Sequence, residues 1–263
     1  MPEGHTVHRI ANAFQADFAG RPVTVTSPQG RFNSDAALIS GQVLKRARAI
    51  GKQMFLEFDG GAVVRIHLGI YGKWQFHDSP DAGITGQVRA RFSAGDKSAD
   101  LRGPTVCEVI TKSDAKAVFN RLGPDPLNAN PSNREAQKFI SRVKASKSPI
   151  GLLLMNQDVI AGIGNVYRAE LLFRAQITPH RPGNQCSTEE LQAIWDDSVK
   201  LMKVGVKTSY MITRDDLFTK RPSKAERNWV YKREGEPCRV CGNNISIELM
   251  AARKLYWCSS CQS

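Results

Sequence analysis

The sequence lacks the features of a membrane or exported protein. Its 263 residues contain no run of about 18 apolar residues, which excludes an ordinary transmembrane helix. The start of the chain has neither the basic flank nor the apolar stretch of a signal peptide. No internal repeat, low-complexity tract or heptad pattern occurs. We therefore expect a cytoplasmic protein that has no membrane partner and is a monomer.

Acidic residues are scarce relative to basic ones. The chain has 25 Asp and Glu against 37 Lys and Arg, a net charge of +12. Residues 200–263 hold 13 basic and 6 acidic residues, so they carry +7 of this charge. Four zinc-bound thiolates would lower that share by two, to +5. The excess favours a polyanionic partner, although a solubilising surface is an alternative.

Cysteine is also infrequent, and four of the six cysteines form one pattern. Two C-x2-C pairs, Cys238 with Cys241 and Cys258 with Cys261, are separated by 16 residues. Each pair can form a tight turn, and four thiolates satisfy tetrahedral zinc. The pattern predicts one structural Zn²⁺ site in a zinc ribbon. We expect a β-hairpin at the second knuckle to display Arg253, Lys254 and Tyr256. Cys107 and Cys186 stand alone, and we expect them to be reduced and packed as small hydrophobic residues.

The N-terminus combines a helix with reactive groups. Apolar residues from Val7 to Phe18 follow helical spacing and end before Gly20. Removal of Met1 would leave Pro2 as a terminal secondary amine with a reference pKa of roughly 8, which is nucleophilic near neutral pH. Glu3 beside it could transfer a proton. The alternative is that Pro2 and Glu3 only begin the helix.

The following segment predicts an antiparallel sandwich or barrel. Its short strands are rich in β-branched or aromatic residues and are divided by turn residues. The expected strands are Val23–Thr26, Val43–Ile50, Gln53–Phe58, Ala62–Leu68, Trp74–Phe76, Val88–Phe92 and Thr105–Ile110. Asp59-Gly60-Gly61 is typical of a hairpin turn. Two connections are candidate sites: Gly51-Lys52, and the 67–72 segment with Ile70 and Tyr71. A solvated lysine and two core side chains are the alternatives.

The chain changes character at residues 121–131, which are dense in Pro, Gly and Asn. Helices are expected afterwards at Asn133–Lys144, Ile150–Met155, Val166–Ala175 and Thr188–Lys207. Ser187-Thr188-Glu189-Glu190 supplies cap-type residues before the last of these helices. Ala161-Gly162-Ile163-Gly164-Asn165 precedes one of them and could either bind a phosphate or cap the helix. We predict an α+β fold with four parts: a sandwich domain (1–120), a linker (121–131), a helical domain (132–225) and a zinc ribbon (226–263).

Six motifs together resemble the formamidopyrimidine-DNA glycosylase and endonuclease VIII family, in the same order and over the whole chain. They are Pro2-Glu3-Gly4, Gly51-Lys52, His67 with Tyr71-Gly72, Arg121-Leu122-Gly123-Pro124-Asp125, the 161–165 segment, and the zinc ribbon with Tyr256-Trp257-Cys258. Gly4 and Tyr71 are more similar to the endonuclease VIII branch. The resemblance implies an N-terminal helix and β-sandwich, then a helix-two-turn-helix domain and a zinc ribbon.

The resemblance also implies a function and residue roles. It implies a base-excision repair DNA glycosylase with AP-lyase activity on oxidised pyrimidines, associated with the nucleoid. Pro2 would attack the sugar, and Glu3 would protonate its ring oxygen. Lys52 would serve the first elimination, and Arg253 would grip a phosphate and serve the second. His67, Arg121 and Asn165 match positions that contact DNA phosphates, and Ile70 with Tyr71 match the wedge that fills the gap left by a flipped base.

Two positions depart from the family pattern. Thr6 stands where relatives have an acid, after His5 instead of proline, and Gly69 stands where relatives often have a larger polar residue. Less void would be filled at Gly69, so we hypothesise that bubble or single-stranded DNA is tolerated beside duplex DNA. A DNA-binding protein with weak or no glycosylase activity is the main alternative. Oxidised-purine specificity and a zinc-ribbon transcription or RNA-binding factor are the others; the latter leaves Pro2 and Glu3 unexplained.

Overall fold

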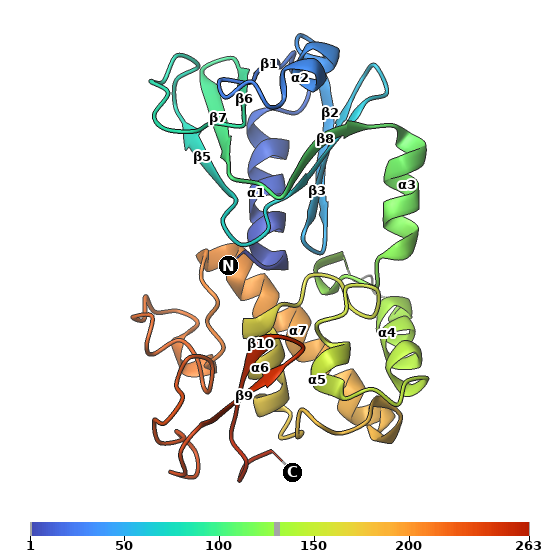
Figure 1. Ribbon diagram of the computed structural model, residues 1–263, viewed down its shortest axis with the longest axis vertical. Coiled ribbons are helices and arrows are strands. Elements are labelled where there is room, and N and C mark those ends of the chain that lie inside the picture. Colours follow the sequence, from blue (N-terminus) through green and yellow to red (C-terminus); the bar gives the residue numbers. More distant parts are fainter. Residues whose placement is uncertain (1, 129–131, 263) are drawn as a thin grey trace. The chain divides into compact units, whose positions relative to one another are not determined.

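The computed structural model describes residues 2–128 and 132–262, and the chain forms two compact units (Figure 1). The first unit is Met1–Arg121 and the second is Leu122–Ser263. Antiparallel sheets dominate the first unit and helices the second, which confirms the predicted α+β class. None of the described helices is long and apolar enough to cross a membrane.

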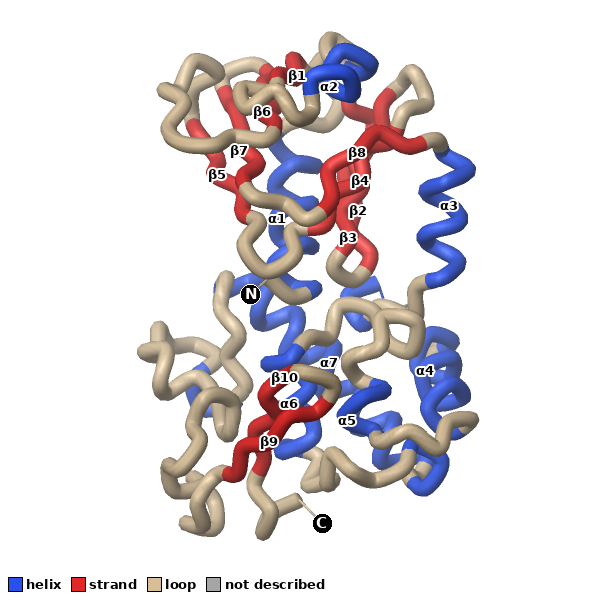
Figure 2. The backbone as a smooth tube through the Cα atoms, viewed as in Figure 1, coloured by secondary structure: helices blue, strands red, loops and turns tan. Residues whose placement is uncertain are grey.

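The first unit contains helix α1 (Gly4–Asp17) and two four-stranded antiparallel sheets (Figure 2). One sheet has the order β1-β6-β7-β5, and the other has the order β2-β3-β4-β8. The strands are β1 (Thr24–Thr26), β2 (Leu44–Ile50), β3 (Gln53–Phe58), β4 (Val63–His67), β5 (Lys73–His77), β6 (Ala90–Ala94), β7 (Lys97–Arg102) and β8 (Val106–Ile110). Residues 59–61 join β3 to β4, as the hairpin prediction requires.

The apolar stripe of α1 supplies the centre of this unit. Phe14 is fully buried, and its ring lies 4.7 Å from those of Phe18 and Trp74 and 5.8 Å from that of Phe92. The helix packs against β2 and β3, while Trp74 and Phe92 come from the other sheet. Packing of these aromatic rings therefore holds α1 against both sheets.

Three elements of the first unit were not predicted. They are α2 (Asn33–Ile39), β7 and α3 (Lys112–Arg121). The β7 sequence lacks β-branched residues, and an ionic cluster stabilises it instead. The buried Asp100 carboxylate accepts hydrogen bonds from Arg91 Nε at 2.7 Å and from the His77 ring at 3.2 Å. The strand propensity of the residues alone does not predict such a strand.

The second unit packs its helices around an apolar core that includes Phe139, Tyr167 and Trp195. The helices are α4 (Arg134–Lys144), α5 (Ile150–Leu153), α6 (Asn165–Arg174) and α7 (Thr188–Thr208), with 3-10 turns at Pro126–Asn128, Gly183–Gln185 and Asp215–Leu217. The capping box expected at the start of α7 is present. The Ser187 side chain accepts from the Glu190 amide, and the Glu190 carboxylate accepts from the Ser187 amide.

Part of the predicted linker is integrated into the second unit. The Gly123 amide donates to the Gln157 carbonyl at 2.8 Å, and the Ala161 amide donates to the Pro124 carbonyl at 2.9 Å. Residues 129–131 lie outside the described residues. The division at residues 121, 132 and 226 stays a prediction.

The C-terminal part carries a hairpin of β9 (Ser246–Met250) and β10 (Arg253–Trp257). Ala251 and Ala252 connect them and have positive φ values of 50° and 58°. Such values at both central residues are typical of a type I′ turn, whose twist suits antiparallel strands. Glycine or asparagine normally occupies these positions, so two alanines leave the turn strained.

Candidate functional site

Pro2 and Glu3 lie directly before the first residue of α1, as predicted. Glu3 is the N-cap residue in extended conformation, and its carbonyl accepts from the Thr6 amide at 2.9 Å. The Glu3 side chain is fully buried and Pro2 is half-buried. With Met1 attached the Pro2 nitrogen is an amide, and it marks the position of the amine that a mature N-terminus would carry. Helix initiation and a reactive N-terminus are thus compatible.

His5 and Thr6 form a neutral polar pair at the positions that depart from the family pattern. His5 Nε2 lies 3.1 Å from Thr6 Oγ1, and the His5 side chain is almost completely buried. Burial, together with the smaller effect of the positive charges of Arg9 and His8, lowers the His5 pKa to about 3. The imidazole is therefore uncharged at neutral pH, and position 6 carries no titrating acid.

Lys52 and His67 lie near each other in the first unit. Gly51, with φ 57°, and Lys52 form the turn that pairs Ile50 with Gln53, and Gln53 pairs in turn with His67. Burial lowers the His67 pKa, as do the charges of Lys52 and Arg65. The Gly69 amide donates to His67 Nδ1 at 3.1 Å, which places the ring proton of this neutral imidazole on Nε2.

The loop after β4, residues 68–72, exposes the two side chains predicted as a wedge. Ile70 is 54% exposed and Tyr71 is 85% exposed, so the alternative that they belong to the core is wrong. Leu68 holds the start of the loop in place because its side chain is buried in the core. Its carbonyl also accepts a hydrogen bond from the Gly72 amide at 2.9 Å. In Figure 1 this loop, the β2–β3 turn and the start of α1 lie at the same end of the first unit.

Asn165 begins α6 and connects it to the hairpin. The Asn165 amide donates from Nδ2 to the Lys254 carbonyl at 2.9 Å, and its Oδ1 accepts from Arg168. Arg253 is exposed beside Lys254, at the start of β10. Asn165 is thus hydrogen-bonded to the residue next to Arg253, a predicted site residue 88 positions away. The expectation that the hairpin displays Tyr256 is wrong, because this ring is 3% exposed and packs 5.1 Å from Tyr231.

Glu170 is an important residue that sequence reasoning missed. Its fully buried carboxylate accepts from the Thr213 hydroxyl and from the amides of Trp229, Val230 and Tyr231 at 2.7, 2.9 and 2.8 Å. Burial raises the pKa of this carboxyl, and the four donors oppose that shift. Glu170 fixes the segment that leads into the cysteine module. The available signal was an acid in an otherwise apolar turn of α6.

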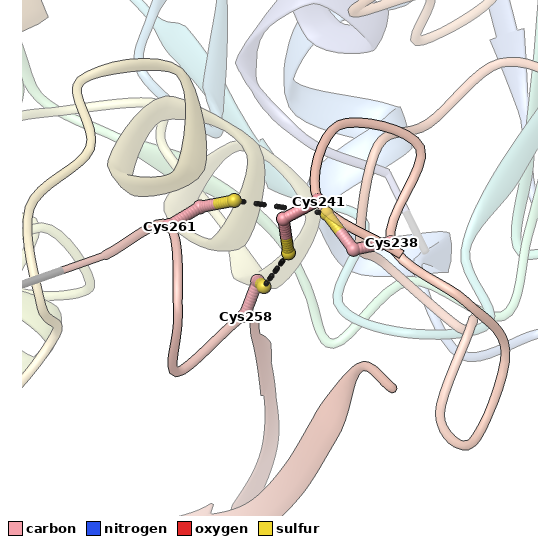
Figure 3. Close-up of side chains that lie close together, drawn as sticks. All are labelled: Cys238, Cys241, Cys258 and Cys261. Atoms are coloured by element: carbon pink, nitrogen blue, oxygen red, sulfur yellow. Dashed lines mark hydrogen bonds between the residues drawn. The ribbon is translucent and has the colours of Figure 1, made fainter. Parts of the chain in front are cut away.

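The four predicted zinc ligands converge (Figure 3). All four Sγ atoms lie within 4.8 Å of one another; Cys241 to Cys258 measures 3.5 Å and Cys238 to Cys261 measures 3.9 Å. Tetrahedral zinc with bonds of about 2.3 Å requires sulfur separations of about 3.8 Å. The residues therefore fit one structural zinc ion, and four thiolates leave no open coordination position.

The segment at residues 208–228 is closed at its base. The Thr213 amide donates to the Arg227 carbonyl at 3.0 Å, and the Arg227 guanidinium lies 3.9 Å from the centre of the Tyr210 ring. Arg174 donates to the Asp215 carboxylate at 2.6 Å and to the Thr213 carbonyl at 2.7 Å.

Arg121, the remaining predicted site residue, is exposed at the end of α3.

Comparison with known proteins defines the class first. A model of the formamidopyrimidine-DNA glycosylase N-terminal domain matches residues 1–107, and one of the H2TH domain of these glycosylases matches residues 122–216. A zinc finger found in FPG and IleRS matches residues 235–263. The Lactococcus lactis Fpg structure, solved with DNA containing N7-benzyl-Fapy-dG, is 22% identical with a TM-score of 0.83 and 99% coverage of each chain. It has the same fold.

Curated relatives then define the family. Endonuclease 8 1 of Mycobacterium tuberculosis is 48% identical over 273 residues, and endonuclease 8 of Escherichia coli is 26% identical over 266 residues. Each alignment covers 100% of both chains. The chain therefore belongs to the formamidopyrimidine-DNA glycosylase and endonuclease VIII family. It is a base-excision repair DNA glycosylase of a family whose members are also AP lyases.

Proposed function

We propose that this protein removes oxidised pyrimidines from DNA through an imine on Pro2 and then cleaves the strand by β,δ-elimination. The observation that carries this proposal is the position of a buried Glu3 carboxyl beside Pro2 at the start of α1. Removal of Met1 exposes a secondary amine there, next to a group able to transfer a proton.

The chemistry begins with attack of the neutral Pro2 nitrogen on the anomeric carbon. The bond to the base breaks with its electron pair, and the base takes a proton as it leaves. Glu3 protonates the ring oxygen as the sugar opens, which leaves an iminium between Pro2 and that carbon. The iminium acidifies the neighbouring carbon, so loss of its proton expels the 3′ phosphate, a step assigned to Lys52. A second elimination, assigned to Arg253, expels the 5′ phosphate.

The other predicted residues bind and shape the DNA. His67, with its proton on Nε2, and Arg121 are proposed to contact phosphates. Asn165 has its side-chain amide engaged with the Lys254 carbonyl, so we propose that it orients Arg253 as well as meeting DNA. The net charge of +12 suits a polyanionic partner such as DNA. The proposed partner is DNA with oxidised bases or abasic sites, acted on by a monomer in the cytoplasm.

Exposed Ile70 and Tyr71 support the wedge assignment. Inserting apolar groups between bases partly offsets the few kcal/mol lost when a base unstacks. Gly69 adds no side chain, so we propose that bubble and single-stranded DNA are also substrates. Excision rates for one lesion in duplex and single-stranded oligonucleotides test this. A strong preference for duplex would contradict it.

A second candidate is a DNA-binding protein with weak or no glycosylase activity, favoured by the uncharged His5 and Thr6 pair. Borohydride trapping separates the two functions. Mature, untagged protein is mixed with labelled DNA carrying an abasic site or an oxidised pyrimidine, beside the Pro2→Gly and Glu3→Gln variants. The proposal requires an adduct on both substrates and its loss on the oxidised base with Glu3→Gln. DNA binding without an adduct would support the second candidate.

A further inference from the structure

The 68–72 loop is built against the segment that joins β7 to β8. The Thr105 amide donates to the His67 carbonyl at 2.9 Å. A Cβ atom placed on Gly69 would lie 1.9 Å from Thr105 Oγ1 and 3.1 Å from Thr105 Cβ. Gly69 also has φ +66°, a conformation that side chains disfavour. The Thr105 hydroxyl thus occupies the space that a side chain at position 69 would need.

The other end of the loop is closely packed at Gly72 and makes an ordinary van der Waals contact at Gly103. A Cβ on Gly72 would lie 2.2 Å from the Leu68 carbonyl oxygen, and one on Gly103 would lie 3.6 Å from the Tyr71 carbonyl oxygen. The 103–105 segment therefore supports both ends of the loop. Between these supports Ile70 and Tyr71 extend into solvent, where apolar side chains gain nothing from burial. Holding them there requires a backbone that cannot collapse onto the sheet.

We propose that Thr105 is a positioning residue that holds the 68–72 loop in the conformation required for insertion into duplex DNA. This inference rests on the proposed function and goes beyond it, because Thr105 acts through the backbone at Gly69. Filling the gap in a duplex requires Ile70 and Tyr71 at fixed positions. A single strand has no stacked gap to fill, so its processing depends less on the loop. Thr105 therefore determines the ratio of duplex to single-strand excision.

Single-turnover excision of one oxidised pyrimidine, in duplex and in single-stranded DNA, tests the role. Thr105→Ala removes the Oγ1 contact, and we expect the duplex to single-strand ratio to fall about tenfold. Thr105→Val keeps a branched side chain and should restore most of the ratio, because the contact is steric. Thr24→Ala makes the same change at an exposed position of β1 and serves as the control. Thermal melting verifies that each variant is folded.

The Gly69 contact gives a second, independent readout. Gly69→Ala should lower the ratio at least as much as Thr105→Ala, because its Cβ collides with Thr105. The double variant Gly69→Ala with Thr105→Ala removes that collision, so its ratio should exceed that of Gly69→Ala alone. Purely additive losses, or equal losses on both substrates, would overturn the proposed role.

The same experiment distinguishes failure of this inference from failure of the proposed function. Wild-type protein that forms no borohydride adduct on abasic or oxidised DNA overturns the proposed function, and the Thr105 role falls with it. Active wild-type protein whose ratio is unchanged by Thr105→Ala overturns only the Thr105 role.

Discussion

Glu170→Gln provides the sharpest test of how the second unit is held together. The carboxylate accepts four hydrogen bonds, two on each oxygen. A glutamine in the same rotamer turns its NH₂ group toward one pair of these donors. The favoured orientation faces Thr213, because the Thr213 hydroxyl can accept from the NH₂ group while it donates to the Arg227 carbonyl at 3.1 Å. Only the Trp229 amide then loses its acceptor. Each buried donor left unsatisfied costs about 1–3 kcal/mol. The expected loss in free energy of unfolding is therefore roughly 2 kcal/mol.

Thermal melting of the zinc-loaded protein measures this loss. For a unit of this size, 2 kcal/mol corresponds to a fall in midpoint of roughly 4–8 °C. Hydrogen exchange should localise the change to the amides of residues 229–231. Glu234→Gln, at an exposed position in the same segment, is the matched control. A Glu170→Gln midpoint within about 2 °C of wild type, with residues 229–231 still protected, would refute the reasoning.

Three further predictions concern pH, metal and the N-terminus. The His5 pKa of about 3 lies below its unfolded value of 6.5, so the unfolded chain takes up a proton first and stability falls as the pH drops below 6.5. Denaturant unfolding should show that the free energy of unfolding falls by about 2 kcal/mol between pH 7 and pH 5. His5→Gln should reduce this dependence on pH. An identical dependence in both proteins would contradict the prediction. Chelating zinc should unfold the region of the four cysteines and weaken DNA binding, while the first unit keeps its melting transition. DNA binding that survives chelation would mean that zinc does not position Arg253. Retaining Met1, or adding an N-terminal tag, should abolish the borohydride adduct because Pro2 is then an amide, and an active tagged protein would remove Pro2 from its role.

The sequence predicted the parts of the fold that follow periodic patterns. The stripe of α1, the capping box of α7 and the spacing of the zinc ligands each involve residues close together in the chain. Strand β7 escaped prediction because its stability depends on Asp100 meeting Arg91 and His77 across neighbouring strands. Such a cluster is visible only once the sheet is assembled.

In the candidate site, too, local motifs were predictable from the sequence and contacts between distant residues were not. Motif resemblance selected Pro2, Lys52 and Arg253, and their assigned roles stay predictions. The contacts that support the motifs could not be selected this way. Asn165 meets Lys254 across 89 positions, and Glu170 meets residues 229–231 across about 60. No local pattern encodes these pairs, because each partner has an ordinary composition in its own segment.

The Ala251-Ala252 turn has a consequence for engineering this protein. Each alanine holds a positive φ at a cost of order 1 kcal/mol, so Asn-Gly at these positions should raise the stability of the hairpin. The substitution leaves every side chain of β10 in register with β9. It would therefore vary the rigidity with which Arg253 is presented without altering its charge or the length of its side chain. The natural hairpin is thus less stable than the same hairpin with Asn-Gly in its turn, and two substitutions are sufficient to change its stability.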